Sequence, residues 1–269
     1  MFYNLIIRLT VSSLLIFYTT LIFATENISI RVSAILQTSN DNVLSMEQLP
    51  KVYSKLIVDV KCELAGNHLI LPPEAELLIE EKGYIDNGAI KGNNSVLIVK
   101  SQDPVIGLNV LISGIWHNAE VYDSWFDFNY SPDFVSNNII KNALSLTDDS
   151  HFCHIYFQTD RTYFFELPYK GETNLGDKLP YSMVGKTKKR KYADLYKDEY
   201  YYARIFTIPS NTHFTIHNHL RMLPTNQGAY FVFWEYKKKN VIIDGKGSIS
   251  GDVREHIYDS PFVKGSNYY

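Results

Sequence analysis

The segment LLIEEKGYIDNGAIKGNNSVLIV, from Leu77 to Val99, most strongly limits what this chain can fold into. It contains brief β-like runs at 77–80, 84–85, 89–90 and 96–99. The positions between these runs are Gly83, Asn87-Gly88 and Gly92-Asn93-Asn94. Glycine and asparagine tolerate the positive φ angles of tight turns, so these positions indicate corners. Because strands this short form no stable hairpin sheet alone, the segment favours a coil that stacks on further coils.

The composition also indicates β structure. The chain of 269 residues has 20 Tyr and 15 Phe, many of them in short runs with Val, Ile and Thr. Aromatic and β-branched residues favour strands, and Gly, Asn and Pro interrupt these runs at close spacing. The formal net charge of -3 gives no basic field for nucleic acid, and the basic run 186–191 (KTKKRK) is interpreted as a solvated loop. We therefore expect an all-β protein with no nucleic-acid partner.

Two phrases occur twice in the same order. LILPPEAELLI (69–79) and FTIPSNTHFTI (206–216) share an apolar residue before Pro and an apolar-x-apolar ending. NVLISG (109–114) and NVIIDG (240–245) form the second pair. The sequence therefore predicts two related β-rich units, at about 55–116 and about 204–251. In the second unit, Asp244-Gly245 and Lys246-Gly247 are expected to form tight corners between strands.

One helix is expected between these units, at about 134–146. Asp133 or Ser136 could cap its first turn, and Pro132 precedes it. Its apolar residues have helical spacing and are Ile139, Ile140, Ala143 and Leu144. A short amphipathic helix of this kind is suited to covering the open apolar end of a stack of β coils.

The N-terminus predicts export. Residues 1–24 have the order of a cleaved secretory signal, with Arg8 before an apolar run that ends at Ala24. This apolar run is short for a bilayer span, so no stable membrane span is expected after cleavage. The mature chain would be periplasmic, cell-surface or extracellular. The predicted organisation is a signal peptide (1–24), an N-terminal β-rich unit (25–130) and a further β domain (131–269) with a long surface loop at 166–202.

An ordered set of phrases in the second half resembles a known family. The set is SWF (124–126), Asp133, IIKNAL, HIYFQTDRTYFF, IPSNTHFTI and NVIIDGKGSISGD. It resembles the opening of secreted bacterial right-handed parallel β-helix proteins of the pectate-lyase superfamily, most firmly over 124–252. The resemblance implies an all-β, pectin-lyase-like right-handed parallel β-helix with a short capping α-helix. In such proteins, loops that leave the coil line a groove that holds a glycan.

The resemblance implies a polysaccharide as the partner. We expect an exported protein for polysaccharide binding and processing, of the lyase or glycoside hydrolase type. The alternative is a non-catalytic, glycan-binding surface or adhesin-like protein. The family's catalytic carboxylates lie in later coils, so we expect the protein to continue beyond Tyr269 and this chain to have no substantial lyase or hydrolase activity. No cofactor is evident, although Ca²⁺ is possible if the protein is lyase-like.

The resemblance directs attention to the loop after Gly251. Its weak catalytic candidates are Asp252, Glu255 and His256, for which the alternative is a solvated loop. The weak substrate-binding candidates are Arg254, Tyr230 and Trp234. The two aromatic residues could stack on sugar rings, but aromatic residues in strands more often belong to the core.

Histidine and cysteine provide no metal site. His213, His217 and His219 alternate along the sequence and could face one way on a strand, but no fourth ligand is in view, so no metal is predicted. Cys62 and Cys153 are the only cysteines. They could form a single long-range disulfide, although a buried free thiol is the more common state of cysteines in such β-like segments.

Overall fold

The computed structural model describes residues 28–37, 42–131, 134–166, 203–224, 230–235 and 237–252. These residues form mostly β-strands in parallel sheets with few helices, which confirms the all-β expectation. The chain divides into two compact units, 1–118 with 125–127 and 119–124 with 128–269. The expected signal peptide (1–24) and residues 167–202 of the expected loop lie outside the described residues.

The first unit consists of short strands that begin earlier than expected. Its elements are β1 (Ser29–Arg31), α2 (Val32–Leu36), η1 (Met46–Gln48), β2 (Lys55–Val58), β3 (Lys61–Glu63), β4 (His68–Ile70), β5 (Glu76–Ile79), β6 (Tyr84–Asp86), β7 (Gly88–Val99) and β8 (Val110–Trp116). Strand β1 pairs with β2, so the stack starts before residue 55. All strand pairs described in this unit are parallel.

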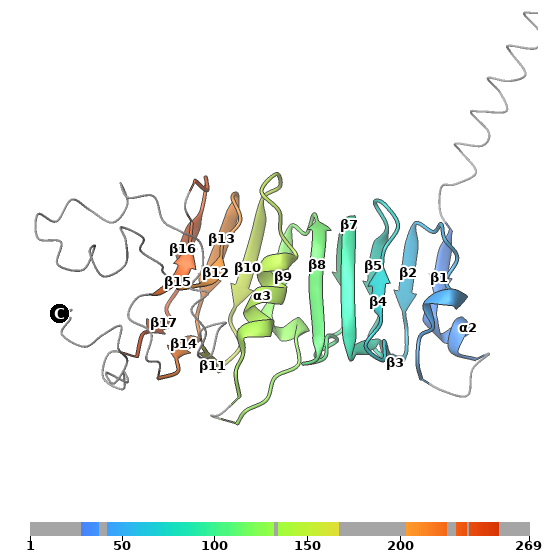
Figure 1. Cartoon of the computed structure of the whole chain (residues 1–269), viewed down its shortest axis with the longest axis horizontal. Helices are drawn as coiled ribbons and strands as arrows, with labels where there is room; N and C mark the ends of the chain where they lie inside the picture. Colours follow the sequence, from blue (N-terminus) through green and yellow to red (C-terminus); the bar gives the residue numbers. More distant parts are fainter. Residues whose placement is uncertain are drawn as a thin grey trace, which may run out of the picture. The chain divides into compact units, whose positions relative to one another are not determined.

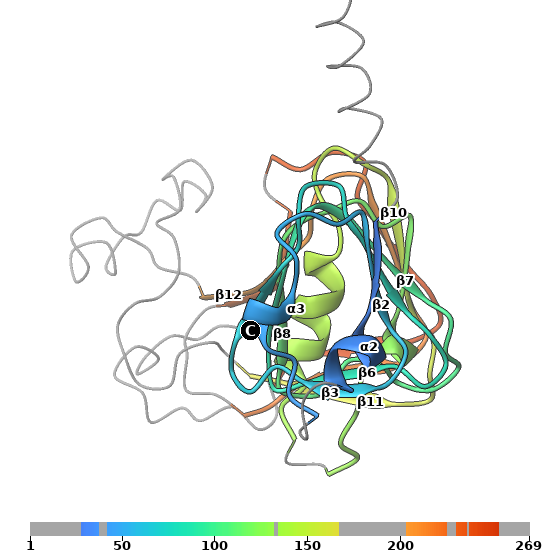
Figure 2. The same ribbon diagram turned by 90° about the vertical axis from the view of Figure 1, so that its right-hand side faces the viewer.

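The strands of the first unit return to the same three sheets after about 21 residues. Lys55 of β2 pairs with Glu76 of β5, which pairs in turn with Val96 of β7. In the same way β3 pairs with β6, and β4 pairs with the beginning of β7, which pairs with β8. β2, β5 and β7 lie side by side in Figure 1, and Figure 2 shows β2, β3 and β8 on three different sides of the unit.

Asparagine and glycine have different roles at the corners of the first unit. Asn87 and Asn94 adopt the left-handed conformation, with φ of 55° and 56°. A Cβ atom on Gly88 would lie 2.6 Å from the carbonyl oxygen of Asn67 and 2.5 Å from the Cβ of Leu64. Gly88 is therefore needed for the close approach of two neighbouring coils, whereas the asparagines make the sharp bends.

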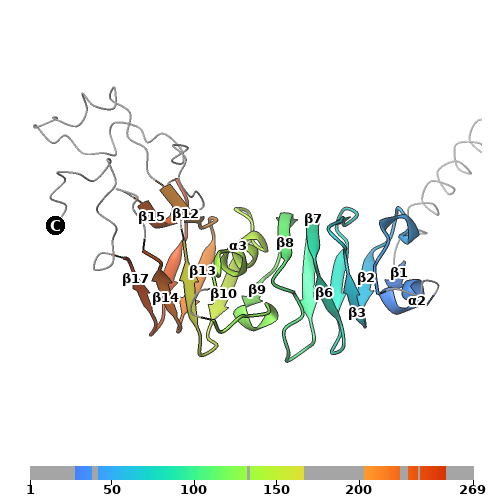
Figure 3. The ribbon, with the colours of Figure 1, turned by 60° about the horizontal axis from the view of Figure 1, so that its bottom comes forward.

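The second unit repeats this arrangement with different strands. Its elements are β9 (Glu120–Tyr122), α3 (Asn137–Ser145), β10 (Cys153–Phe157), β11 (Thr162–Phe165), β12 (Ala203–Thr207), β13 (Thr212–Ile216), β14 (His219–Met222), β15 (Tyr230–Trp234), β16 (Ile242–Asp244) and β17 (Ser248–Ser250), while η2 (Asp123–Trp125) spans the division. The sheet orders are β16-β13-β10-β9, β11-β14-β17 and β12-β15. All described pairs are again parallel, and Figure 3 shows β12 beside β15.

The expected helix is present as α3. It buries Ile139, Ile140, Ala143 and Leu144, the residues whose spacing predicted it. Ser136 is its N-cap residue, but no side-chain hydrogen bond is made there. The helix leads from β9 to β10 and contacts β12. It therefore lies against the β12 strand of the β12-β15 sheet.

The two repeated phrases have different outcomes. In the first pair the Pro corner is the same, since Glu74 and Asn211 occupy equivalent positions and have φ of 60° and 58°. The strands before and after these corners are β4 and β5 in one unit and β12 and β13 in the other. In the second pair, β8 pairs with β7 beside β4, whereas β16 pairs with β13. The NVLISG and NVIIDG phrases are therefore not equivalent.

The corner glycines of the second unit lie where the sequence predicts them. Gly245 has a φ of 126°, and a Cβ atom there would collide with the backbone of Ile216. A Cβ atom on Gly247 would collide with the carbonyl oxygen of Asn218. Both glycines therefore allow the last described coil to lie directly on the preceding coil. Ile243 of β16 pairs with the buried Phe214 but is itself 40% exposed, at the edge of the described sheet.

The two cysteines are buried and free. Cys62 lies in β3 and Cys153 in β10, and burial raises the pKa of each thiol to about 12. These thiols therefore stay protonated at neutral pH, which makes them poor nucleophiles. Within the described ranges, no helix has the length and apolar character that a bilayer crossing requires.

Asn118 replaces a missing strand partner in the first unit. Its side chain is 3% exposed, accepts a hydrogen bond from the Leu97 amide at 3.1 Å and donates one to the Leu97 carbonyl at 2.7 Å. This side-chain amide therefore satisfies both backbone groups of a residue in β7.

We predict that Asn118→Leu lowers the free energy of unfolding by about 2–4 kcal/mol, because it leaves two buried backbone groups without partners. Urea denaturation followed by circular dichroism measures this loss. The control is Asn67→Leu at an exposed position, which should change stability by less than about 0.5 kcal/mol. Equal stability of the two variants would contradict the role assigned to Asn118.

Candidate functional site

One sheet of the second unit carries an unusual set of outward-facing side chains. In β10 the buried residues Cys153, Ile155 and Phe157 alternate with the half-buried His154 and Tyr156. β13 has the same alternation. Because successive side chains of a strand point to opposite faces, the half-buried residues face outward.

The parallel register aligns these side chains into two rows. The first row is Glu120, His154, His213 and Ile242. The second row is Tyr122, Tyr156, Thr215 and Asp244. We call these eight residues the outer face. It runs across β9, β10, β13 and β16, which lie next to one another in that order.

Rings stack along the outer face. The rings of Tyr122 and Tyr156 are 4.8 Å apart and nearly parallel, at 10°. Tyr156 also stacks on His154 at 3.8 Å, and His154 stacks on His213 at 4.0 Å. Four rings from three strands therefore form one continuous array, which is held in place by its own contacts.

Hydrogen bonds join the histidines to the last strand. His154 Nε2 is 2.8 Å from Thr215 Oγ1, which donates to Asp244 Oδ1 at 2.8 Å. His213 Nε2 is 2.9 Å from Asp244 Oδ2. At the other end of the face, the Tyr122 hydroxyl donates to Glu120 Oε2 at 2.8 Å. These internal hydrogen bonds therefore orient the polar groups of the face.

The electrostatic environment sets the charges of the outer face. Burial, together with the neighbouring His213, lowers the pKa of His154 below its usual value. Hydrogen bonds from His213 and Thr215 lower the pKa of Asp244. The hydrogen bond to Glu120 raises the pKa of Tyr122 to about 12. At neutral pH, His154 is therefore neutral, and Asp244 carries a negative charge.

A buried carboxylate beneath the outer face holds the turns of three strands. Asp123 follows Tyr122 directly and has no exposed surface. It accepts hydrogen bonds from the amide and the hydroxyl of Thr159, from the Tyr163 hydroxyl at 2.9 Å and from Asn218 Nδ2 at 3.0 Å. Thr159 lies after β10, and Asn218 lies between β13 and β14. The carboxylate thereby fixes the ends of β9, β10 and β13 relative to one another.

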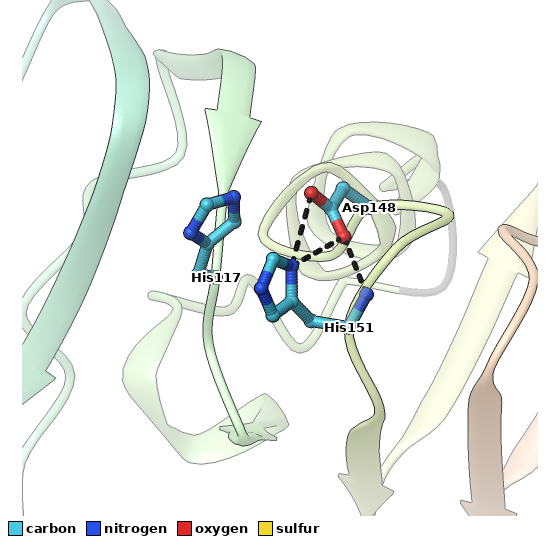
Figure 4. A group of neighbouring side chains, drawn as sticks. All are labelled: His117, Asp148 and His151. Atoms are coloured by element: carbon cyan, nitrogen blue, oxygen red, sulfur yellow. Dashed lines mark hydrogen bonds and ion pairs between the residues drawn. The ribbon is translucent and has the colours of Figure 1, made fainter. Parts of the chain in front are cut away.

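A second carboxylate and imidazole lie in the turn before β10. Figure 4 shows His151 Nδ1 beside Asp148 Oδ1, at 3.2 Å. Burial alone would raise the pKa of Asp148, but hydrogen bonds from Ser150 and His151 outweigh it and lower the pKa to about 2. Figure 4 also labels His117, which belongs to the first unit. Within the second unit, Asp148 and His151 stabilise a turn.

The three histidines considered for metal binding have separate partners. His213 lies in β13 and contacts Asp244. His217 lies beyond the end of that strand, where its Nδ1 accepts a hydrogen bond from the Lys246 amide at 3.1 Å. His219 lies in β14, with Nδ1 2.7 Å from Ser248 Oγ. The expectation of one shared strand is therefore wrong, because β13 ends at Ile216.

The other sequence-based candidates remain predictions. Asp252 is described just beyond β17 and is 3% exposed, and Trp234 in β15 is 8% exposed. Tyr230 begins β15. Arg254, Glu255 and His256 lie outside the described residues. The three described candidates, Asp252, Trp234 and Tyr230, do not belong to the strands of the outer face.

Sequence reasoning missed the outer face as a unit. The alternation in HIYF and HFTI indicates that His154 and Tyr156, and His213 and Thr215, share faces of their strands. That signal was available, but the alignment of His154 with His213 depends on a pairing between residues 59 positions apart. Asp123 was missed because one aspartate after a strand is also typical of a solvated turn.

Comparison with protein-family models, curated proteins and solved structures gave no match.

We predict that Asp123→Asn lowers the free energy of unfolding by at least about 3 kcal/mol, because the added NH₂ group would face several donors that now share one charged acceptor. Urea denaturation of the full chain measures the effect. Asp160→Asn in the same turn region is the matched control, since Asp160 is exposed, and should be nearly neutral. A neutral Asp123→Asn variant would refute the structural role of this carboxylate.

We also predict that His213→Gln raises the pKa of His154, since it removes both a neighbouring imidazole and part of the burial that disfavours protonation. Titration followed by NMR of the imidazole protons measures this pKa. His219→Gln, on β14, should leave the His154 titration unchanged. A pKa that stays the same or falls in His213→Gln would show that the stacked pair does not control protonation.

Proposed function

We propose that this is an exported protein whose strands form a right-handed parallel β-helix and which binds polysaccharide on its outer face. The fold proposal is supported within each unit by parallel strands that return to the same sheets in a fixed order. Connections between parallel strands of one sheet are right-handed in nearly all proteins, which supports the handedness. Export rests on the signal-like segment 1–24.

The ring array is the observation on which the binding proposal depends. A sugar ring presents apolar C–H groups on its faces and hydroxyl groups around its edge. The half-buried rings of Tyr122, Tyr156 and His154 offer flat surfaces on which the apolar faces of a sugar can stack. Neighbouring carboxylate and imidazole groups offer hydrogen-bond partners for the hydroxyl groups at the edge of the sugar. Because the array crosses successive strands, it suits an extended chain better than a single sugar.

The outer face is better suited to binding than to glycoside hydrolysis. Its two carboxylates, Glu120 and Asp244, lie on β9 and β16, with β10 and β13 between them. At about 4.8 Å per strand, these outer strands are about 14 Å apart. Glycosidases place their carboxyl pair about 5–5.5 Å or about 6.5–9.5 Å apart. The spacing on this face matches neither arrangement.

Lyase chemistry with Ca²⁺ is not favoured on this face either. Ca²⁺ takes 6–8 oxygen ligands, and adjacent carboxylates usually supply several of them. The outer face has single carboxylates at its two ends, and Asp244 is already bonded to His213 and Thr215. Polysaccharide processing, with or without Ca²⁺, therefore remains a prediction for residues outside the outer face.

Affinity electrophoresis in gels that contain xylan, β-glucan, galactan, chitosan, polygalacturonate or alginate tests the proposal. We expect retardation of the protein by at least one of these polysaccharides. Tyr156→Ala should weaken binding about three- to tenfold, because it removes the central ring of the array.

The matched control is Tyr130→Ala, which removes a tyrosine that is 76% exposed and lies outside the array. It should leave binding unchanged, and circular dichroism should show that both variants are folded. No retardation by any polysaccharide, or equal losses in the two variants, would refute binding on the outer face.

A further inference from the structure

The charges of the outer face restrict the class of glycan, provided that this face is the polysaccharide-binding surface proposed above. The strands β9, β10, β13 and β16 contain Glu120 and Asp244 but no lysine or arginine. Recognition of carboxylate groups in proteins usually relies on arginine or lysine, which can pair with them directly. From this we infer that the outer face selects uncharged or amino-bearing glycan chains and rejects polyuronates at neutral pH.

The imidazoles do not supply the missing positive charge. Burial and the adjacent His213 both lower the pKa of His154, which keeps this ring neutral at pH 7.5. His213 is bonded to the Asp244 carboxylate, so this imidazole already faces an anion of the protein itself. The ring of His213, stacked at 4.0 Å, therefore adds to the cost of placing a positive charge on His154.

The cations that border the face lie in turns rather than in its rows. Lys238 is paired with Asp149, with Nζ 2.7 Å from the carboxylate. Lys239 precedes β16, and Lys246 follows it. Both are exposed, so their attraction for a distant anion is screened within about 10 Å at ordinary salt. A uronate lying on the rings would therefore share the rows of the face with Glu120 and Asp244, whereas no ammonium group belongs to these rows.

Neutral glycans suit the same groups. The carboxylates accept hydrogen bonds, as the neutral imidazoles also can, and sugar hydroxyls can donate them. Thr215 Oγ1 already lies between His154 and Asp244, which shows that hydroxyl groups fit this polar environment. An amino sugar adds a cation that either end carboxylate can pair with. The substrate class is therefore a neutral or amino-bearing polysaccharide.

The test compares affinities for xylan, chitosan and polygalacturonate at pH 7.5 and low salt by affinity electrophoresis. We expect polygalacturonate to bind at least tenfold more weakly than the better of the other two. Glu120→Lys should improve polygalacturonate binding at least threefold, because it places an ammonium group in the first row. Glu63→Lys makes the same charge change at an exposed position of β3 in the first unit and should have no such effect.

The outcomes separate this inference from the proposal on which it rests. If no polysaccharide binds, the proposed function fails. If polygalacturonate binds as tightly as the others, and Tyr156→Ala weakens that binding, the outer face binds glycans and only the charge selection is wrong. If Glu63→Lys helps as much as Glu120→Lys, the gain comes from net charge, and the selection by this face is likewise refuted.

Discussion

The hydrogen bonds of the Asp123 carboxylate are the constraint on which the second unit depends. A carboxylate with no exposed surface is costly to bury, and only a full set of donors makes its burial tolerable. Thr159 and Asn218 supply donors from the turns after β10 and β13, and Tyr163 supplies one from β11. A slip in the register of one coil would remove a donor, so the polar cluster specifies a single alignment.

The outer face inherits its geometry from this alignment. Tyr122 is the residue before Asp123, and Tyr156 lies three residues before Thr159. The buried hydrogen bonds therefore hold the two tyrosine rings opposite one another on the outside of the sheet. The first unit uses the Asn118 amide for a related purpose, where a side chain completes the pairing of Leu97. In both units, single polar side chains fix the position of apolar coils that could otherwise slide.

The sequence predicted local features better than it predicted which residues of distant strands lie side by side. Short strands, Pro corners and the helix could be inferred because each depends on neighbouring residues, as for Ile139 and Leu144 on one side of α3. Strand β1 was missed because it has three residues and its pairing partner, β2, follows a long connection. The outer face needed the pairing of His154 with His213, which no local pattern reveals. The histidine error shows the same limit, since alternation predicts a shared face only within one strand.

The in-register stacking has a consequence for how such a surface could change over generations. Each added coil contributes one more strand to every sheet, so a coil added at the β16 edge would lengthen the outer face by about 4.8 Å without disturbing the existing contacts. A coil inserted between β10 and β13 would instead separate His154 from His213. It would also move the Asn218 side-chain amide, which donates to Asp123, away from that carboxylate. Duplication at the β16 edge is thus the tolerated route by which the outer face could grow in equal steps.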